Sequence, residues 1–121
     1  MVLTIGKVLV AILLLILVDA VWLGTVGQYA LAMTARIQGS AVAFRFGAAA
    51  VVYVALALLV LQASSASQAA LIGAASYAVY DFTSYTLLKD YDVRIAVADT
   101  LWGGALFAIV YTVLDRAGVL T

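Results

Sequence analysis

The feature that most constrains this chain is a set of long apolar stretches that contain almost no charge. The first extends from Val8 to about Val26, and its single charged residue is Asp19. A soluble domain of this size has too little interior to hide so much apolar surface, whereas a membrane-spanning α-helix needs roughly 20 such residues. Hydrophobic residues make up 68% of the chain, against roughly 45–50% in soluble domains. We therefore predict an integral membrane protein, in which this stretch is a transmembrane helix and not a cleaved leader.

Polar breaks divide the 121 residues into four predicted helices that form one domain, residues 1–121. The expected helices cover about residues 3–32, 43–61, 69–88 and 93–114. These stretches are too long, and alternate too little, to be barrel strands of about 10 residues. Small residues recur in the last three helices and permit the close approach by which membrane helices pack. The predicted fold class is all-α, an integral membrane four-helix bundle whose last two helices are antiparallel neighbours.

The absence of several residue types excludes whole classes of chemistry. The sequence contains no Pro, Cys, His, Glu or Asn. A Cys/His zinc site and a Ser–His–Asp or Cys–His nucleophile are therefore impossible within this chain. Aspartates alone make a sparse magnesium site, so neither a metal nor a cofactor is expected. The net charge is zero and no basic run is present, which argues against nucleic-acid binding.

The distribution of Lys and Arg predicts the orientation in the membrane. The side with the two charged loops carries four of these residues, namely Arg36, Arg45, Lys89 and Arg94. The other side carries Lys7 and Arg116. Because cytoplasmic loops are enriched in Lys and Arg, this excess predicts a multi-pass protein with both termini on the non-cytoplasmic side.

Three aspartates, Asp19, Asp81 and Asp99, lie inside segments predicted to be surrounded by hydrocarbon. An aspartate at the bilayer centre costs about 2.5–3.5 kcal/mol, so such residues face the bundle interior and commonly mark a functional site. All three are expected in the membrane half nearest the charged loops. Arg45 and Arg94 extend from that same side, so we expect an acidic cluster with these two arginines as charge partners. The alternative is a purely structural role, in which the carboxyl groups lock helices together.

The third predicted helix carries the most polar face. Tyr77, Asp81, Ser84 and Tyr85 share one side of it, at i, i+4, i+7 and i+8 spacing. Their hydroxyl groups can hydrogen-bond the carboxyl group of Asp81 and offset part of the cost of burying it. Tyr77, Ser84 and Tyr85 are therefore candidate site residues.

A short motif occurs twice in the chain. Asp19-Ala-Val-Trp22-Leu-Gly24 lies in the first predicted helix, and Asp99-Thr-Leu-Trp102-Gly-Gly104 lies in the last. The i, i+3 spacing puts carboxyl group and indole on one helix face, and a tryptophan N–H can donate to an aspartate of a neighbouring helix. Trp22 and Trp102 are therefore candidate site residues too. Two explanations stay open: a partial inverted repeat of the transporter kind, or an aromatic anchor plus a polar packing residue used twice.

Several of these segments resemble the signature of one family. Tyr80-Asp81-Phe82-Thr83-Ser84-Tyr85-Thr86-Leu87-Leu88-Lys89-Asp90 and Ala98-Asp99-Thr100-Leu101-Trp102-Gly103-Gly104 are similar to small predicted four-helix membrane proteins known as domain of unknown function 2177. Asp19-x-x-Trp22-Leu23-Gly24 and Ile37-Gln38-Gly39-Ser40 also fit, so the resemblance covers nearly the whole chain. One departure is Ser84, where the family usually has Asn. The resemblance implies the four-helix fold and supplies no activity.

Three functions are compatible with these residues. The favoured prediction is a small oligomeric transporter or channel, in which the aspartates carry protons or coordinate a cation. A homo-oligomer within the lipid bilayer is expected, because a chain of this length encloses little pore by itself. The alternatives are an intramembrane enzyme that acts on a lipid-like substrate by carboxylate acid–base chemistry, and a structural subunit of a membrane assembly.

Overall fold

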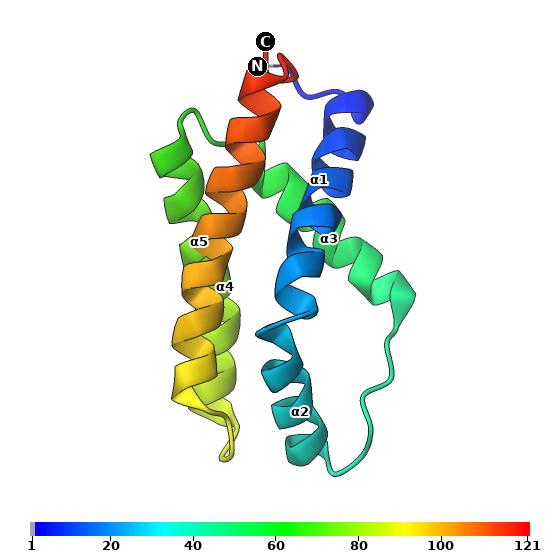
Figure 1. Cartoon of the computed structure of the whole chain (residues 1–121), viewed down its shortest axis with the longest axis vertical. Helices are drawn as coiled ribbons and strands as arrows, with labels where there is room; N and C mark the ends of the chain where they lie inside the picture. Colours follow the sequence, from blue (N-terminus) through cyan, green and yellow to red (C-terminus); the bar gives the residue numbers. More distant parts are fainter. Residues whose placement is uncertain (1) are drawn as a thin grey trace.

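The computed structural model describes residues 2–121, in which all regular secondary structure is α-helical (Figure 1). The elements are α1 (Ile5–Leu23), α2 (Gly27–Gln38), α3 (Phe46–Val60), α4 (Ala66–Leu87) and α5 (Val93–Arg116). The all-α prediction is therefore confirmed. The prediction of a four-helix bundle is not, because these residues form five helices and the first expected helix is divided in two.

The division falls at residues 24–26, inside the range 3–32 for which the sequence predicts one unbroken helix. Gly27 starts α2 directly against Trp22, where an added Cβ atom would lie 2.9 Å from the Trp22 carbonyl oxygen. Gly24 and Gly27 are weak helix formers, so breaking the helix at this point costs little free energy. Leu23 and Val26 keep the segment apolar across the break, so hydropathy alone does not reveal it.

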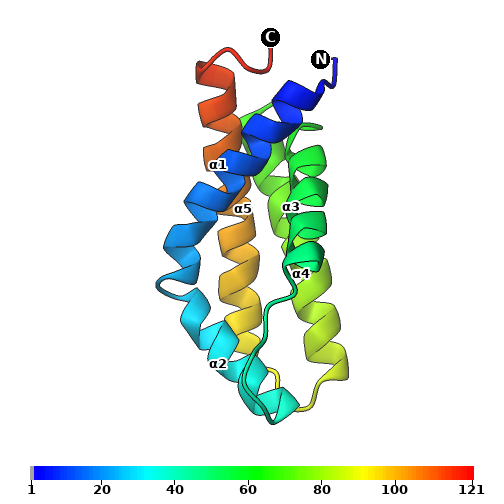
Figure 2. The ribbon, with the colours of Figure 1, turned by 90° about the vertical axis from the view of Figure 1, so that its right-hand side faces the viewer.

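The chain passes four times along the long axis of the molecule. α1 and α2 together form the first pass, α3 returns, α4 runs in the direction of α1, and α5 returns again (Figures 1 and 2). Both termini consequently lie at one end, which we call the terminal end. The α4–α5 turn and the start of the α2–α3 connection lie at the opposite end, which we call the loop end. Which end faces the cytoplasm stays a prediction from the distribution of Lys and Arg.

Side-chain caps fix where three of the helices begin. Thr4, Ser65 and Asp92 each accept a hydrogen bond from a backbone N–H in the first turn of α1, α4 and α5, at 3.2, 3.1 and 2.9 Å respectively. Each cap satisfies an amide that has no acceptor within its own helix. These short polar side chains therefore set the helix starts that hydropathy leaves vague by a few residues.

The most extensive contact between helices joins α4 to α5, which are antiparallel neighbours as predicted. Gly73 and Gly103 face each other in this contact. A Cβ atom at Gly73 would clash with the Gly103 carbonyl oxygen and would lie 2.6 Å from Phe107 Cγ. Gly104 is less crowded, since its Cβ would lie 3.2 Å from the Ala70 carbonyl oxygen. We call this contact the α4–α5 seam; it depends on small residues that let two backbones approach closely.

The bundle is apolar both inside and outside. Leu15 of α1 and Leu106, Phe107 and Val110 of α5 are completely buried in a core on the terminal side. Large apolar side chains also cover the outer surface of α1, where Ile5 is 80% exposed. α1 and α5 are each long and apolar enough to cross a membrane, and α3 is a shorter apolar helix. This distribution is the one expected when lipid surrounds the helices.

Candidate functional site

The three aspartates predicted to lie inside the bundle are brought together there from three helices. Asp19 of α1 and Asp81 of α4 are only 7% and 1% exposed, and Asp99 of α5 is partly buried. The phenol of Tyr77 lies within electrostatic reach of all three carboxyl groups. We call Asp19, Asp81 and Asp99 the acidic cluster. Its members differ sharply in how well their oxygens are satisfied.

Both carboxyl oxygens of Asp19 have hydrogen-bond donors. The Trp102 indole N–H donates to Oδ1 at 2.9 Å, and the Tyr53 hydroxyl donates to Oδ2 at 2.6 Å. The first bond joins α1 to α5, and the second joins α1 to α3. Hydrogen bonds of this kind offset the cost of burying a polar group. Asp19 therefore fastens three helices together.

The two copies of the repeated motif meet in the structure. The rings of Trp22 and Trp102 stack with their centroids 5.2 Å apart and an angle of 7° between their planes. The expected bond from a tryptophan to an aspartate of a neighbouring helix is formed by Trp102, which donates to Asp19. Trp22 lies beside Asp99 without a hydrogen bond of standard geometry. The two copies of the motif therefore lie side by side, but only the tryptophan of the second copy donates a hydrogen bond to an aspartate.

Asp81 is only half satisfied. The Tyr91 hydroxyl donates to its Oδ1 at 2.7 Å. Its Oδ2 is one of two buried side-chain polar atoms without a hydrogen-bond partner among residues 2–121, the other being Thr100 Oγ1. Asp99 lies next to Asp81, again without a hydrogen bond of standard geometry. A buried carboxyl oxygen without a hydrogen-bond partner is costly in an apolar interior, and structural packing alone does not require one.

Tyr91 connects the acidic cluster to the loop end. It belongs to the α4–α5 turn and packs with Met33 and Ala96, leaving only 9% of its surface exposed. Burial raises the pKa of Tyr91 above its usual value, and its hydrogen bond to Asp81 raises that pKa further. The phenol therefore keeps its proton at neutral pH and acts as the donor to Asp81.

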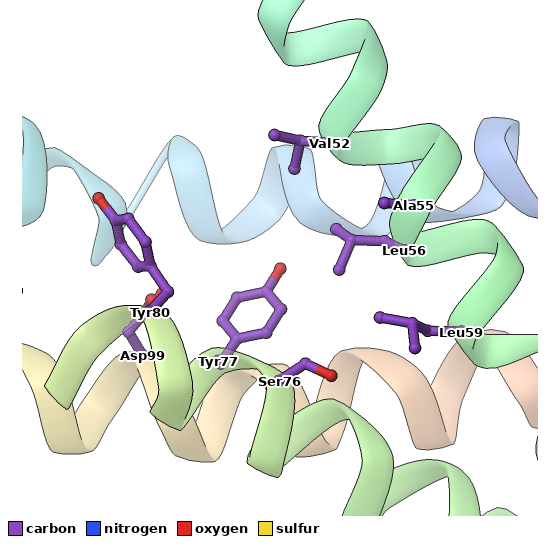
Figure 3. Close-up of a pocket in the computed structure, with 8 residues that line it drawn as sticks. All are labelled: Val52, Ala55, Leu56, Leu59, Ser76, Tyr77, Tyr80 and Asp99. Carbon is purple, nitrogen blue, oxygen red and sulfur yellow. The ribbon is translucent and has the colours of Figure 1, made fainter. Parts of the chain in front are cut away.

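A cavity of about 540 Å³ lies beside the acidic cluster, between α3 and α4 (Figure 3). Its lining comes from three helices: Val52, Ala55, Leu56 and Leu59 of α3, Ser76, Tyr77 and Tyr80 of α4, and Asp99 of α5. The Tyr77 hydroxyl extends into the space between α3 and α4. The Ser76 hydroxyl instead donates to the Ile72 carbonyl oxygen at 2.7 Å. Asp99 is the only charged residue of the lining.

Two predicted residues of α4 do not contact Asp81. The Ser84 hydroxyl donates to the Tyr80 carbonyl oxygen at 2.8 Å, so it is satisfied within its own helix. Tyr85 is 46% exposed and packs edge-on against Phe82, with ring centroids 6.4 Å apart. The expected hydrogen bonds from Ser84 and Tyr85 to Asp81 are therefore wrong, because only a narrow strip of the helix faces inward.

The two predicted charge partners also lie elsewhere. Arg94 forms an ion pair with Asp92 at 2.9 Å, and its side chain is 88% exposed. Its hydrogen bonds hold the pKa of Asp92 below the usual value. Arg45 is exposed just before α3, and no ion pair links it to the acidic cluster in residues 2–121. The expected pairing is wrong for both residues, because both side chains lie on the surface and Arg94 is bound to Asp92 instead.

Sequence reasoning missed the residues that actually donate to the aspartates. Tyr53 carries the only hydrogen-bonding side chain of α3, and that isolation in an apolar helix is a usable signal. Tyr91 is the only aromatic residue in the charged turn of residues 88–92. Tyr80, which lines the cavity, lies one residue before Asp81. Pairing either donor with its aspartate requires knowing which helices are neighbours.

The chemistry of the acidic cluster is that of carboxyl and phenol groups. Within residues 2–121, no three potential metal-ligating side chains are grouped closely enough to hold a metal ion. What the cluster offers is a set of protonatable oxygens, two of them on adjacent aspartates, next to a cavity that Asp99 lines. Such an arrangement can bind and exchange protons, or pair with a cationic group of a ligand.

Comparison with known protein families identifies the family of this chain. A family model described as "Predicted membrane protein (DUF2177)" matches residues 4–114, which include the acidic cluster and both tryptophans. No curated protein and no solved structure matches the chain. The match confirms the resemblance of the motif segments and covers nearly the whole sequence. With its apolar helices α1 and α5 and the family signature, the chain belongs to the DUF2177 family of predicted membrane proteins.

Proposed function

We propose that this membrane protein is a small transporter that moves protons through Asp81 and Asp99. The observation that carries the proposal is the buried, unpartnered Oδ2 of Asp81 beside the carboxyl group of Asp99. A free carboxyl oxygen in hydrocarbon is expensive, and such residues commonly belong to proton relays. The proposal includes four membrane crossings, with α1 and α2 as one crossing, and both termini on the non-cytoplasmic side.

The hydrogen bonds suggest that one aspartate of the acidic cluster has a structural role and that the other two carry protons. Asp19 has donors for both oxygens and holds α1, α3 and α5 together. Asp99 borders the cavity, and Asp81 lies next to Asp99 and accepts from Tyr91. A proton taken up at Asp99 can pass to Asp81 and leave toward the loop end past Tyr91. The relay thus uses two of the three aspartates.

A transporter is favoured over an open channel. From the acidic cluster toward the terminal end, the interior is filled by a core that includes Leu15, Leu106, Phe107 and Val110, all completely buried. Protons therefore need a moving element or a carried substrate to complete the crossing. We propose a homo-oligomer as well, because exposed apolar faces are available for contact with further copies.

The test is proton flux into liposomes under a potassium diffusion potential, followed with a pH-sensitive dye inside. Wild type should acidify the lumen faster than protein-free liposomes. Asp81→Asn and Asp99→Asn should each reduce the flux to the protein-free level while their helicity is retained. Asp90→Asn, which removes an exposed carboxylate from the α4–α5 turn, is the matched control and should leave the flux unchanged.

The proposal fails if folded wild type shows no flux above protein-free liposomes over a range of pH and potential. It also fails if both asparagine variants conduct as well as wild type. Asp19→Asn separates the two roles: we expect it to weaken folding more than it weakens flux per folded molecule. If Asp19→Asn instead reduced the flux more than the stability, Asp19 would belong to the proton relay and would not be mainly structural.

One observation favours a second candidate, an intramembrane enzyme that acts on a lipid-like substrate. The cavity is open at the side of the bundle between α3 and α4, and it places a carboxyl group next to apolar walls. Carboxyl groups in such a place can serve as a general acid and base. Turnover of added lipids by the purified protein, lost in Asp99→Asn, would favour the enzyme over the transporter.

A further inference from the structure

The cavity between α3 and α4 has two chemically different parts. Its outer walls are formed by aliphatic side chains of α3, among them Val52, Leu56 and Leu59. The carboxyl group of Asp99 lies beside Tyr80, and the hydroxyl of Tyr77 extends into the space toward α3 (Figure 3). A volume of about 540 Å³ falls within the roughly 300–1,000 Å³ of small-molecule pockets. The shape and lining suit one alkyl chain with a compact polar head.

The cavity opens sideways, toward the surface that lipid covers in a membrane protein. Val52 is 52% exposed and Tyr80 is 64% exposed, so the residues at the rim belong to the outer surface of the bundle. α3 and α4 meet over only a short part of their length, in contrast to α4 and α5. A ligand dissolved in the bilayer can therefore enter between α3 and α4 without passing through water.

Charge identifies the head group. Asp99 is the one charged residue of the lining. Its carboxyl group lies next to Asp81 and Trp22, and neither it nor the Tyr77 hydroxyl forms a hydrogen bond of standard geometry in the described residues. The two arginines predicted as charge partners lie elsewhere: Arg94 is paired with Asp92, and Arg45 is at the surface. A carboxylate without a counter-ion in a low-dielectric site is best matched by an ammonium group, and the Tyr77 ring adds a surface that attracts cations.

We infer that this cavity binds a single-chain amphiphile with a protonated amine head group, taken up from the bilayer between α3 and α4. The ammonium group pairs with Asp99, and the alkyl chain lies along Val52, Leu56 and Leu59. The inference goes beyond the proposed function, because binding requires the cavity and Asp99 but no movement of protons.

The test is equilibrium binding of tritiated dodecylamine to the protein in lipid nanodiscs, with protein-free nanodiscs as the measure of simple partition. We expect a saturable component of one site per chain. Unlabelled dodecylamine should displace it, whereas dodecanol and dodecanoate should not. Asp99→Asn keeps the shape and removes the charge, and should weaken binding about tenfold or more, as expected for loss of a charge-assisted hydrogen bond.

A pair of α3 variants tests the location. Ala55→Phe places a ring in the cavity and should abolish saturable binding. Val54→Phe adds the same ring on a face of α3 that does not line the cavity, and should bind as wild type does. Both variants should show wild-type helicity and the same size-exclusion profile before binding is compared.

Several results would overturn the inference. These are the absence of a saturable component in folded wild type, unchanged binding in Asp99→Asn, and unchanged binding in Ala55→Phe. Equal displacement by dodecanol would assign the site to neutral amphiphiles and reject the amine. Because no ion gradient is used, failure here leaves the proton-flux test untouched, and failure of that test leaves this one untouched.

Discussion

Helix α4 is tightly packed on the side that faces α5 and loosely packed on the side that faces α3. Toward α5, Gly73 and Gly103 bring two backbones so close that neither position has room for a Cβ atom. Toward α3, a cavity of about 540 Å³ separates the helices and is open at the side. One helix therefore forms a closed seam on one face and the wall of an open cavity on the other.

The difference explains why neighbouring aspartates have different environments. Asp81 lies on the closed side at 1% exposure, with one oxygen bonded to Tyr91 and the other left without a partner. Asp99 lines the open side. The seam holds α4 and α5 in fixed register and so keeps the two carboxyl groups adjacent. A rigid contact on one face thus supports an accessible polar site on the other.

The largest effect should come from filling the seam. Gly73→Ala puts a Cβ atom against the Gly103 carbonyl oxygen and 2.6 Å from Phe107 Cγ, so α4 and α5 must move apart. We expect a loss of about 1–3 kcal/mol in the free energy of unfolding, as for other overpacked interiors. Unfolding by increasing SDS in mixed micelles, followed by circular dichroism, measures it.

Two substitutions on other sites show whether the seam itself is responsible. Ala55→Leu, on α3, adds bulk to the cavity that α3 and α4 enclose and should change stability little, because the cavity has room. Gly47→Ala adds a Cβ that meets nothing within 4 Å, and should be neutral or slightly stabilising. Equal losses in all three variants would remove the contrast between the closed and the open side.

An intermediate effect is expected from the two tryptophans. Trp102→Phe keeps an aromatic ring for the stack but deprives Asp19 Oδ1 of its donor. In membrane proteins such a bond contributes about 1 kcal/mol, so the free energy of unfolding should fall by about that amount. Trp22→Phe is the matched control, since no hydrogen bond of standard geometry uses its N–H in the described structure, and should cost less. A larger cost for Trp22→Phe would show that Asp99, on the open side, depends on a donor after all.

The smallest effect concerns the turn that closes the seam at the loop end. Hydrogen bonds from the Arg94 side chain, and then from its backbone N–H, hold the pKa of Asp92 below its usual value. A depressed pKa stabilises the fold at pH values above the unfolded pKa of about 3.9. That contribution is lost as the pH falls through the lower pKa of the folded state. Because the ion pair lies at the surface, with the Arg94 side chain 88% exposed, the change should be small.

Asp92→Asn tests this pH dependence, because asparagine still caps a helix but carries no charge. SDS unfolding midpoints of wild type and variant should differ at neutral pH and converge in acid. Asp90→Asn, in the same turn, should follow the wild-type profile. A constant difference between wild type and Asp92→Asn at all pH values would exclude the charge of Asp92 as its cause.

Much of the fold was predictable, because hydropathy and helix caps are local properties. The expected ranges 69–88 and 93–114 correspond to α4 (Ala66–Leu87) and α5 (Val93–Arg116) within a few residues. The break between α1 and α2 was missed, since the sequence stays apolar through Leu23 and Val26. Gly24 and Gly27 permit that break, but many membrane helices contain glycine without breaking, so their presence alone does not predict it.

The candidate site was predictable only in part. Burial of Asp19 and Asp81 follows from the cost of a carboxyl group in lipid, which any membrane helix must avoid. The hydrogen-bond donors to these two aspartates cannot be predicted from that cost. Helical spacing pointed to Ser84 and Tyr85, whereas Tyr53 and Tyr91 are the tyrosines that bond to the aspartates. Spacing identifies residues on one helix face, and hydrogen bonds between helices depend on how the faces meet.

The amino-acid sequence was sufficient to predict a helical membrane protein with three aspartates in its apolar segments and a repeated Asp–Trp motif. Length, hydropathy and the cost of buried charge are enough for this, because each acts within one helix. Three outcomes could be seen only in the folded chain. The tryptophans of the two motifs stack, both carboxyl oxygens are bonded in Asp19 but not in Asp81 or Asp99, and α4 is closed on one side and open on the other. Those outcomes depend on where small residues let two helices approach, and that is a property of the pair and not of either helix alone.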